Sequence, residues 1–110
     1  MKANLMNITP AELKARLDRK EAFRLIDVRE PDEWAVARLP RAELIPLSQF
    51  QQRAASELSP DEALILYCHH GIRSRKAQDY LKAQGYSNVL NLAGGIDAWA
   101  LKVDPTMKRY

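Results

Sequence analysis

The sequence predicts an α/β fold of three layers, in which a mostly parallel central sheet of about five strands carries helices on both faces. Short apolar segments alternate along the chain with segments that carry helix signals, and parallel neighbouring strands need crossover connections of that kind. The 110 residues suffice for one compact core. We therefore expect a single domain over residues 1–110, with its core at about 8–100 and a polar tail at 101–110.

The first elements are a helix, a strand and a short helix. Thr9, followed by Pro10 at the first helical position and Glu12 at the third, has the pattern of a capping box and predicts a helix to about residue 20. The apolar run at 23–28 predicts a strand. The charged cluster at 29–33 then predicts a turn and a short helix.

The middle of the chain predicts one more strand and one more helix. A brief strand is expected at 44–45, where Pro46 closes it. Ser48, with Gln51 three residues later, repeats the capping-box pattern and predicts a helix to about Glu57. Residues 59–61 then form a predicted turn.

The last part of the chain begins with the strongest strand signal. Residues 63–67 are apolar without alternation, which is typical of a strand covered on both faces. A helix is predicted at 73–84 with Gly85 as its carboxyl-terminal cap, and a strand at 89–92. Gly94 and Gly95 predict a turn into a final short helix.

Composition and charge exclude several classes of protein. With 46% apolar and 28% charged residues, the chain resembles an ordinary globular domain. No apolar run approaches the roughly 20 residues that span a bilayer, and residues 1–7 do not begin an export signal. The net charge of +3 is mild, and aromatic residues do not interleave with the basic ones. We expect a cytoplasmic protein with neither membrane nor nucleic acid as a partner.

Cys68 is the only cysteine. This excludes an internal disulfide, a Cys-x-x-Cys redox pair and a zinc site built from several thiolates. His69 and His70 are adjacent, but adjacent side chains rarely converge on one ion and no carboxylate lies nearby in the sequence. We expect no metal and no cofactor.

Cys68 opens a short loop that points to nucleophilic chemistry. It follows the most buried strand at the sheet edge where ligands bind in such folds. The loop runs directly into a helix, so its backbone N–H groups can converge on an anion, and Gly71 supplies the freedom for positive φ. The candidate catalytic residue is Cys68. The loop and anion-binding candidates are His69, His70, Gly71, Ile72, Arg73 and Ser74.

Cations follow the loop closely. Arg73, Arg75 and Lys76 lie in the first helical turn, where the helix dipole disfavours positive charge by about 0.3 to 1 kcal/mol each. An anionic Cys68 at the loop centre would reverse that penalty. An ordinary thiol with a pKa of about 8.5 is about 3% ionised at pH 7, whereas a pKa of about 6.5 would give about 75%.

Three further residues have two interpretations each. Asp27 ends a strand and is expected at the same sheet edge as Cys68, so it is a candidate support for the loop together with Arg29. The simpler interpretation is that Asp27 pairs with a backbone N–H group or with Arg29. Arg73 is either an anion contact or an ion-pair strut beneath the loop, and the sequence does not separate the two.

Three segments together resemble the rhodanese-like sulfurtransferase domains. The loop Cys68-His69-His70-Gly71-Ile72-Arg73-Ser74 resembles the active-site loop of that family. The segment 25–30 looks like the family's amino-terminal strand motif, and 92–99 is similar to its closing motif. The resemblance implies a rhodanese-like fold and a thiosulfate-type sulfurtransferase. In it, Cys68 takes a sulfane sulfur from thiosulfate or a persulfide donor and passes it to a thiophilic acceptor.

The implied partners are a small anionic sulfur donor and a thiol or cyanide acceptor, with a sulfur-relay protein as a further candidate. One alternative is a non-catalytic or carrier module of this fold that docks on a partner protein. A phosphatase or arsenate reductase of the same fold is the other, but those enzymes carry one more residue between cysteine and arginine. Four residues separate Cys68 from Arg73 here, which favours sulfur.

The chain departs from the family pattern at two places. Many family loops have Arg where this chain has His69, so a permanent charge is replaced by one that titrates near pH 6.5. If His69 faces the donor, His69→Arg is expected to lower the Michaelis constant for thiosulfate. The segment 37–42 also lacks the two glycines and the histidine that many members have, and carries Arg38 and Arg41 instead.

Overall fold

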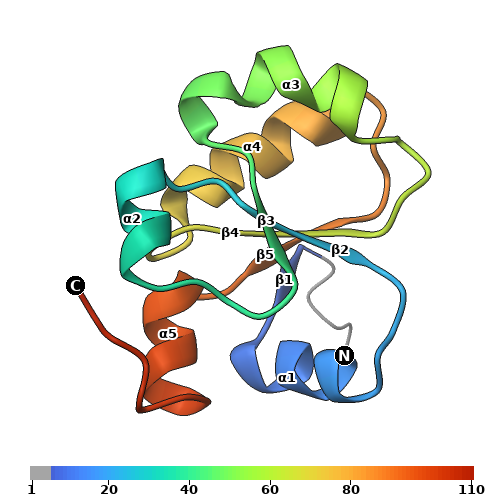
Figure 1. Cartoon of the computed structure of the whole chain (residues 1–110). Helices are drawn as coiled ribbons and strands as arrows, with labels where there is room; N and C mark the ends of the chain where they lie inside the picture. The colour runs from blue at the N-terminus through green and yellow to red at the C-terminus, as the bar shows by residue number, and fades with distance from the viewer. Residues whose placement is uncertain (1–5) are drawn as a thin grey trace.

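The computed structural model describes residues 6–110 and contains one five-stranded sheet between two layers of helices (Figure 1). The strand order is β1-β5-β4-β2-β3, and every neighbouring pair is parallel. The predicted three-layer α/β fold is therefore confirmed. The strands are β1 (Asn7–Ile8), β2 (Arg24–Asp27), β3 (Ala42–Leu44), β4 (Leu64–Tyr67) and β5 (Val89–Leu92).

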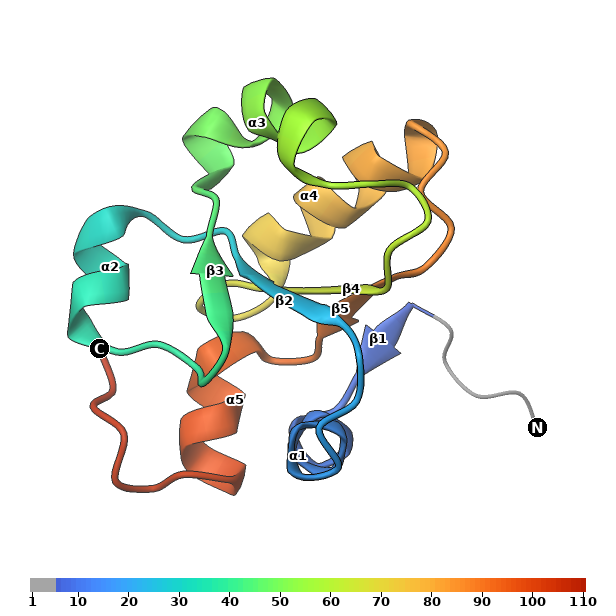
Figure 2. The ribbon, with the colours of Figure 1, turned by 45° about the vertical axis from the view of Figure 1, so that its right-hand side comes forward.

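Helices cover both faces of the sheet. The 3₁₀ segment η1 leads into α3, which lies with α4 on one face, while α1 and α5 lie on the other (Figure 1). The short helix α2 lies at one end of the sheet (Figure 2). The bounds are α1 (Pro10–Asp18), α2 (Pro31–Val36), η1 (Leu47–Gln49), α3 (Phe50–Glu57), α4 (Ile72–Ala83) and α5 (Gly95–Lys102).

The side chains of β4 divide the core into two parts. Leu64 and Leu66 join the apolar cluster beneath α3 and α4, whereas Ile65 and Tyr67 join the cluster beneath α1 and α5. This alternation follows from the two-residue period of a strand. Because both faces are covered, all four residues of β4 are buried. The next residue, Cys68, continues the alternation and enters the α3/α4 cluster.

Two predicted helix caps are present. The Thr9 hydroxyl accepts a hydrogen bond from the Glu12 backbone N–H at 3.1 Å, and the Glu12 carboxylate accepts one from the Thr9 N–H at 2.9 Å. At the end of α4, Gly85 has φ +93°, and the Tyr86 N–H reaches back to the Leu81 carbonyl at 3.0 Å. Local sequence is therefore sufficient to place these helix ends.

Two predictions in the middle of the chain were wrong in detail. The strand expected at 44–45 is β3, which lies earlier because Ala42 and Glu43 pair with β2. Ser48 does not cap the following helix. It lies inside η1, and its hydroxyl donates to the Glu30 carboxylate at 3.0 Å, so α3 begins only at Phe50. A distant acidic partner thus replaces the expected local cap.

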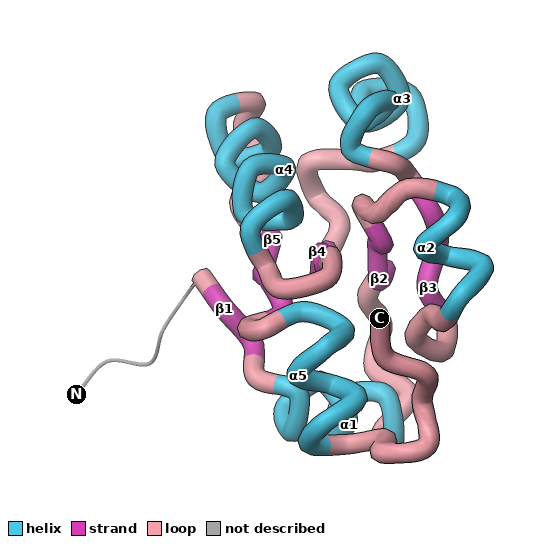
Figure 3. Tube along the Cα trace, turned by 90° about the vertical axis from the view of Figure 1, so that its left-hand side faces the viewer, coloured by secondary structure: helices cyan, strands magenta, loops and turns pink. Residues whose placement is uncertain are grey.

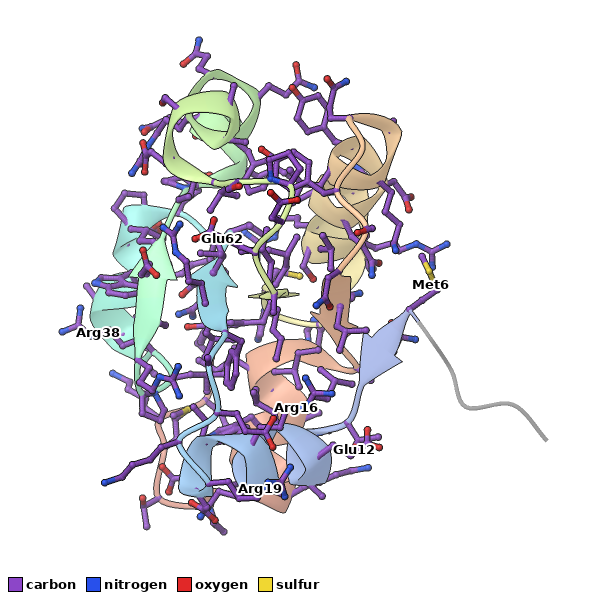
Figure 4. The ribbon with its side chains drawn as sticks, turned by 90° about the vertical axis from the view of Figure 1, so that its right-hand side faces the viewer. Met6, Glu12, Arg16, Arg19, Arg38 and Glu62 are labelled. Carbon is purple, nitrogen blue, oxygen red and sulfur yellow. The ribbon has the colours of Figure 1, made fainter. Side chains whose placement is uncertain are left out.

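The edges of the fold differ most from the sequence pattern. Strand β1 has only two residues and no apolar run, so its pairing with β5 was not predicted. Trp34 on α2 is half-buried and belongs to neither of the two apolar clusters of the core. The Arg38 guanidinium lies 4.7 Å from the centre of its ring, and Arg38 extends away from the sheet (Figure 4).

Within residues 6–110, no helix has both the length and the apolar character needed to span a bilayer. The prediction that residues 1–7 do not begin an export signal concerns mainly residues 1–5, which lie outside the described part of the chain.

Candidate active site

Cys68 lies at the carboxyl edge of β4, between that strand and α4. Only 1% of the residue is exposed. All five strands are parallel, so the carboxyl ends of β2, β4 and β5 meet at this edge. The candidate nucleophile is therefore placed where α/β sheets bind ligands, but inside the packed interior.

Hydrogen-bond donors surround the Cys68 sulfur. The Gly71 backbone N–H donates to Sγ at 3.0 Å, and the Ser74 hydroxyl oxygen lies 3.4 Å from Sγ. The backbone N–H groups of His70 and Ser74 also point to the sulfur. Gly71 has φ +105°, a backbone conformation that residues with a Cβ rarely adopt. The loop can turn around the sulfur because this position is glycine.

This environment favours the thiolate. Burial raises the pKa of the Cys68 thiol, but the Ser74 hydroxyl and the backbone N–H groups of Ser74, Gly71 and His70 outweigh burial and lower it. Each of these groups can donate to a sulfur anion. The net result is a pKa below the ordinary thiol value, as an activated nucleophile requires.

The first turn of α5 supports the loop from the other side. The Ile96 N–H donates to the Cys68 carbonyl at 2.9 Å, and the Asp97 N–H donates to the His69 carbonyl at 3.1 Å. Gly95 has φ +63°, and a Cβ at this position would collide with these two carbonyl groups. Glycine is thus needed at position 95, where α5 approaches the loop.

Arg73 is held by an acidic partner on α2. Its guanidinium donates two hydrogen bonds to the Glu33 carboxylate, at 2.6 and 2.8 Å. The Arg73 contact lowers the pKa of Glu33 to about 2, against the opposing effect of burial. Arg75 likewise pairs with Asp79 at 3.2 Å. Arg73 thus has the arrangement expected of an ion-pair strut, and not that of a free anion contact.

His69 lies in a stack of three rings. Its ring centre is 4.0 Å from that of His70 on one side and 4.0 Å from that of Tyr110 on the other. Burial, together with the neighbouring His70, lowers the pKa of His69. Within residues 6–110, His69 Nε2 is buried and has no hydrogen-bond partner. The His69 ring is therefore enclosed, whereas the side chain of His70 is 59% exposed.

The last residues cross this region, which the sequence did not indicate. The chain after α5 runs towards α2 (Figure 3). Tyr110 donates to the Glu33 carboxylate and accepts from the Arg29 guanidinium, both at 2.8 Å. Arg109 pairs with Asp97 at 2.9 Å. The predicted polar tail therefore packs against the loop, and no pattern in residues 101–110 distinguishes it from a solvated end.

Asp27 and Arg29 form a buried ion pair at 2.7 Å. Asp27 pairs in register with Tyr67, and the Arg29 guanidinium lies 5.6 Å from the centre of the Tyr67 ring. Cys68 is on the opposite face of the sheet. The pair supports α2 and Tyr110 through Arg29, and within residues 6–110 the side-chain hydrogen bonds of Asp27 and Arg29 do not reach the cysteine loop.

The structure places a carboxylate beside the two histidines after all. One ligand atom each of His69, His70 and Asp97 lies within 4.8 Å of the others. An imidazole binds a metal in its own plane, however, and these two rings are stacked at only 27°. Asp97 is also held by Arg109. As arranged, the three side chains do not fit one metal ion.

Comparison with known proteins identifies a matching family and relatives that are similar in sequence and in structure. A family model described as "Rhodanese-like domain" matches residues 9–102. A sulfurtransferase of Allochromatium vinosum is 42% identical over 84% of this chain and 86% of its own length. A rhodanese-like domain protein of Staphylococcus aureus has a similar structure, with a TM-score of 0.80 and 31% identity over 96% of this chain and 98% of that one.

A longer relative contains a similar segment. The probable adenylyltransferase/sulfurtransferase MoeZ of Mycobacterium tuberculosis is 40% identical over 94% of this chain. The chain spans only 26% of the length of that protein.

Proposed function

Because the chain belongs to the rhodanese-like domain family, we propose that it is a sulfurtransferase that moves a sulfane sulfur from thiosulfate or a persulfide donor to a thiophilic acceptor through Cys68. The supporting observation is the set of N–H donors around Sγ, which suits an anionic sulfur. The related sulfurtransferase of similar length agrees with this class of reaction.

The proposed reaction has two halves. The Cys68 thiolate attacks the sulfane sulfur of the donor, and a new S–S bond forms while the donor's own bond to that sulfur breaks. The leaving group, sulfite in the case of thiosulfate, takes the electron pair. A thiolate or cyanide acceptor then attacks the outer sulfur of the Cys68 persulfide and releases the Cys68 thiolate. The same N–H groups stabilise this thiolate before the first half and after the second.

The placement of Arg73 argues against phosphate chemistry. Stabilising a tetrahedral oxyanion at the loop needs a free cation or more donors than sulfur transfer requires. Arg73 is committed to Glu33 at two atoms, and the loop is one residue shorter than in phosphatases that resemble it. We expect negligible turnover of an aryl phosphate.

A carrier role is the second candidate, because Cys68 is almost fully buried and a relative, the putative sulfur carrier protein YrkF of Bacillus subtilis, is 31% identical over 93% of this chain. In that role a protein partner would open the loop and receive the sulfur. Ile72, 70% exposed at the start of α4, offers such a partner an apolar contact beside the loop.

Steady-state kinetics separate the two roles. With thiosulfate or a small persulfide as donor and cyanide as acceptor, an enzyme gives parallel double-reciprocal lines, which indicate a ping-pong reaction. Cys68→Ser should abolish turnover. If the chain accepts one sulfur per molecule but does not turn over with any small acceptor, the carrier role replaces the enzyme role.

A further inference from the structure

A single hydrogen lies between two acceptors beside the nucleophile. The Ser74 hydroxyl oxygen is 3.4 Å from Cys68 Sγ and 2.5 Å from Asn91 Oδ1. Ser74 has no exposed surface, and Asn91 on β5 is 6% exposed. A hydroxyl carries one hydrogen, so Ser74 donates to Cys68 or to Asn91 at any moment, but not fully to both.

The orientation of the Asn91 amide decides which acceptor receives it. Asn91 Nδ2 donates to the Gly71 backbone carbonyl at 3.1 Å, and a carbonyl can only accept. The other amide atom, Oδ1, therefore faces Ser74. Since Oδ1 also can only accept, the Ser74 hydrogen points to Asn91 while Cys68 is a thiol, as the shorter of the two distances indicates. The hydroxyl can lower the pKa of Cys68 only when this hydrogen turns to Sγ.

In this arrangement the Ser74 oxygen presents its lone pairs to the sulfur. A protonated Cys68 can donate its S–H to Ser74, which completes a chain from Cys68 through Ser74 to Asn91. A thiolate has no hydrogen to donate. To stabilise the thiolate, Ser74 must turn its hydrogen to Sγ and leave Asn91 Oδ1, a buried acceptor, without that bond.

We propose that Asn91 is a positioning residue that competes with the Cys68 thiolate for the hydroxyl hydrogen of Ser74. The backbone N–H groups favour the thiolate, and Asn91 opposes them through Ser74. This inference builds on the proposed role of Cys68 as the sulfur-transfer nucleophile. The same competition returns when an acceptor attacks the persulfide, because the Cys68 thiolate is then the leaving group.

The rate of alkylation of the lone cysteine by iodoacetamide, measured against pH, tests this competition. Asn91→Ala frees the Ser74 hydrogen but also removes the support of the Gly71 carbonyl. The same substitution in a Ser74→Ala background measures the second effect alone. Asn91→Ala changes the pKa of Cys68 in both backgrounds. We expect this change to be more negative by about 0.5 to 1 unit with Ser74 present than in the Ser74→Ala background.

Equal shifts in the two backgrounds, or a more positive shift with Ser74 present, would show that Asn91 does not compete for the hydrogen. Asn91→Val, which keeps more of the buried volume, repeats the comparison should Asn91→Ala unfold. The infrared S–H band of the unsubstituted chain gives a further check without any change at Asn91. An S–H that donates to Ser74 absorbs at lower frequency than in Ser74→Ala, and an unshifted band contradicts the inference.

Neither measurement uses a sulfur donor. A chain that transfers no sulfur can still show the competition, and a chain without the competition can still transfer sulfur. The inference and the proposed function therefore fail separately.

Discussion

Substituting Gly95 by alanine tests whether the first turn of α5 supports the cysteine loop. Gly85→Ala is a matched control, because Gly85 also has positive φ, at +93°, but a Cβ there meets no atom within 4 Å. We expect Gly85→Ala to lower the free energy of unfolding by about 1 to 2 kcal/mol, the usual cost of a left-handed conformation for a residue with a Cβ.

Gly95→Ala carries the same conformational cost and a collision with the carbonyl groups of Cys68 and His69. Relieving the collision requires the loop and α5 to separate, which weakens the hydrogen bonds from Ile96 and Asp97. At about 0.5 to 1.5 kcal/mol for each bond, the extra loss is about 1 to 3 kcal/mol. Because the Gly71 N–H moves with the loop, the pKa of Cys68 should also rise.

Urea unfolding of both variants measures the free-energy difference, and the pH dependence of iodoacetamide alkylation measures the pKa of Cys68. The support described for the loop is refuted if Gly95→Ala costs no more than Gly85→Ala and leaves the alkylation profile unchanged. A rise in the pKa of Cys68 in Gly85→Ala would also contradict it, since Gly85 lies at the far end of α4.

Three further substitutions test separate contacts. Glu33→Gln should destabilise the fold by about 1 to 2 kcal/mol at pH 7. Arg73 lowers the pKa of Glu33 to about 2, from about 4.3 in an unfolded chain. The stability difference between the unsubstituted chain and Glu33→Gln in urea unfolding should therefore shrink as the pH falls below about 5. A difference that stays constant from pH 3 to 7 contradicts this expectation. Tyr110→Ala should raise the pKa of His69 towards its ordinary value, seen by NMR titration, because the ring that buries the imidazole is removed, whereas Tyr110→Phe should not. Arg41 has φ +68°, so Arg41→Ala should be less stable than Arg41→Gly by about 1 kcal/mol in urea unfolding; equal stabilities would show that the backbone there is unstrained.

The parts of the fold that the sequence predicts are those with local signals. Thr9 and Glu12 cap α1 through a contact three residues apart, and the apolar run before Cys68 is long enough to identify a strand buried on both faces. The cysteine loop is also contiguous, so Gly71 and the start of α4 can be expected from neighbouring residues. In each case the pattern and its physical cause lie within a few positions.

The remaining parts depend on residues that are distant in sequence. Asn91 on β5 reaches Ser74 on α4, and Glu33 reaches Arg73 from a helix 40 positions earlier. Tyr110 contacts Glu33 from 77 positions later in the chain. Polar side chains such as these have no periodicity that reveals their partners. Ser48 shows the reverse case. Its local pattern predicts a helix cap, but its hydroxyl donates to the distant Glu30 carboxylate instead.

Intact-mass measurement after incubation with a sulfane donor tests the central claim most directly. The account predicts that thiosulfate or a persulfide adds the mass of one sulfur atom to the chain, that cyanide or dithiothreitol removes it, and that Cys68→Ala acquires none. An unchanged mass of the unsubstituted chain with every donor tested, or an equal gain by Cys68→Ala, would contradict the proposal that Cys68 carries the sulfur.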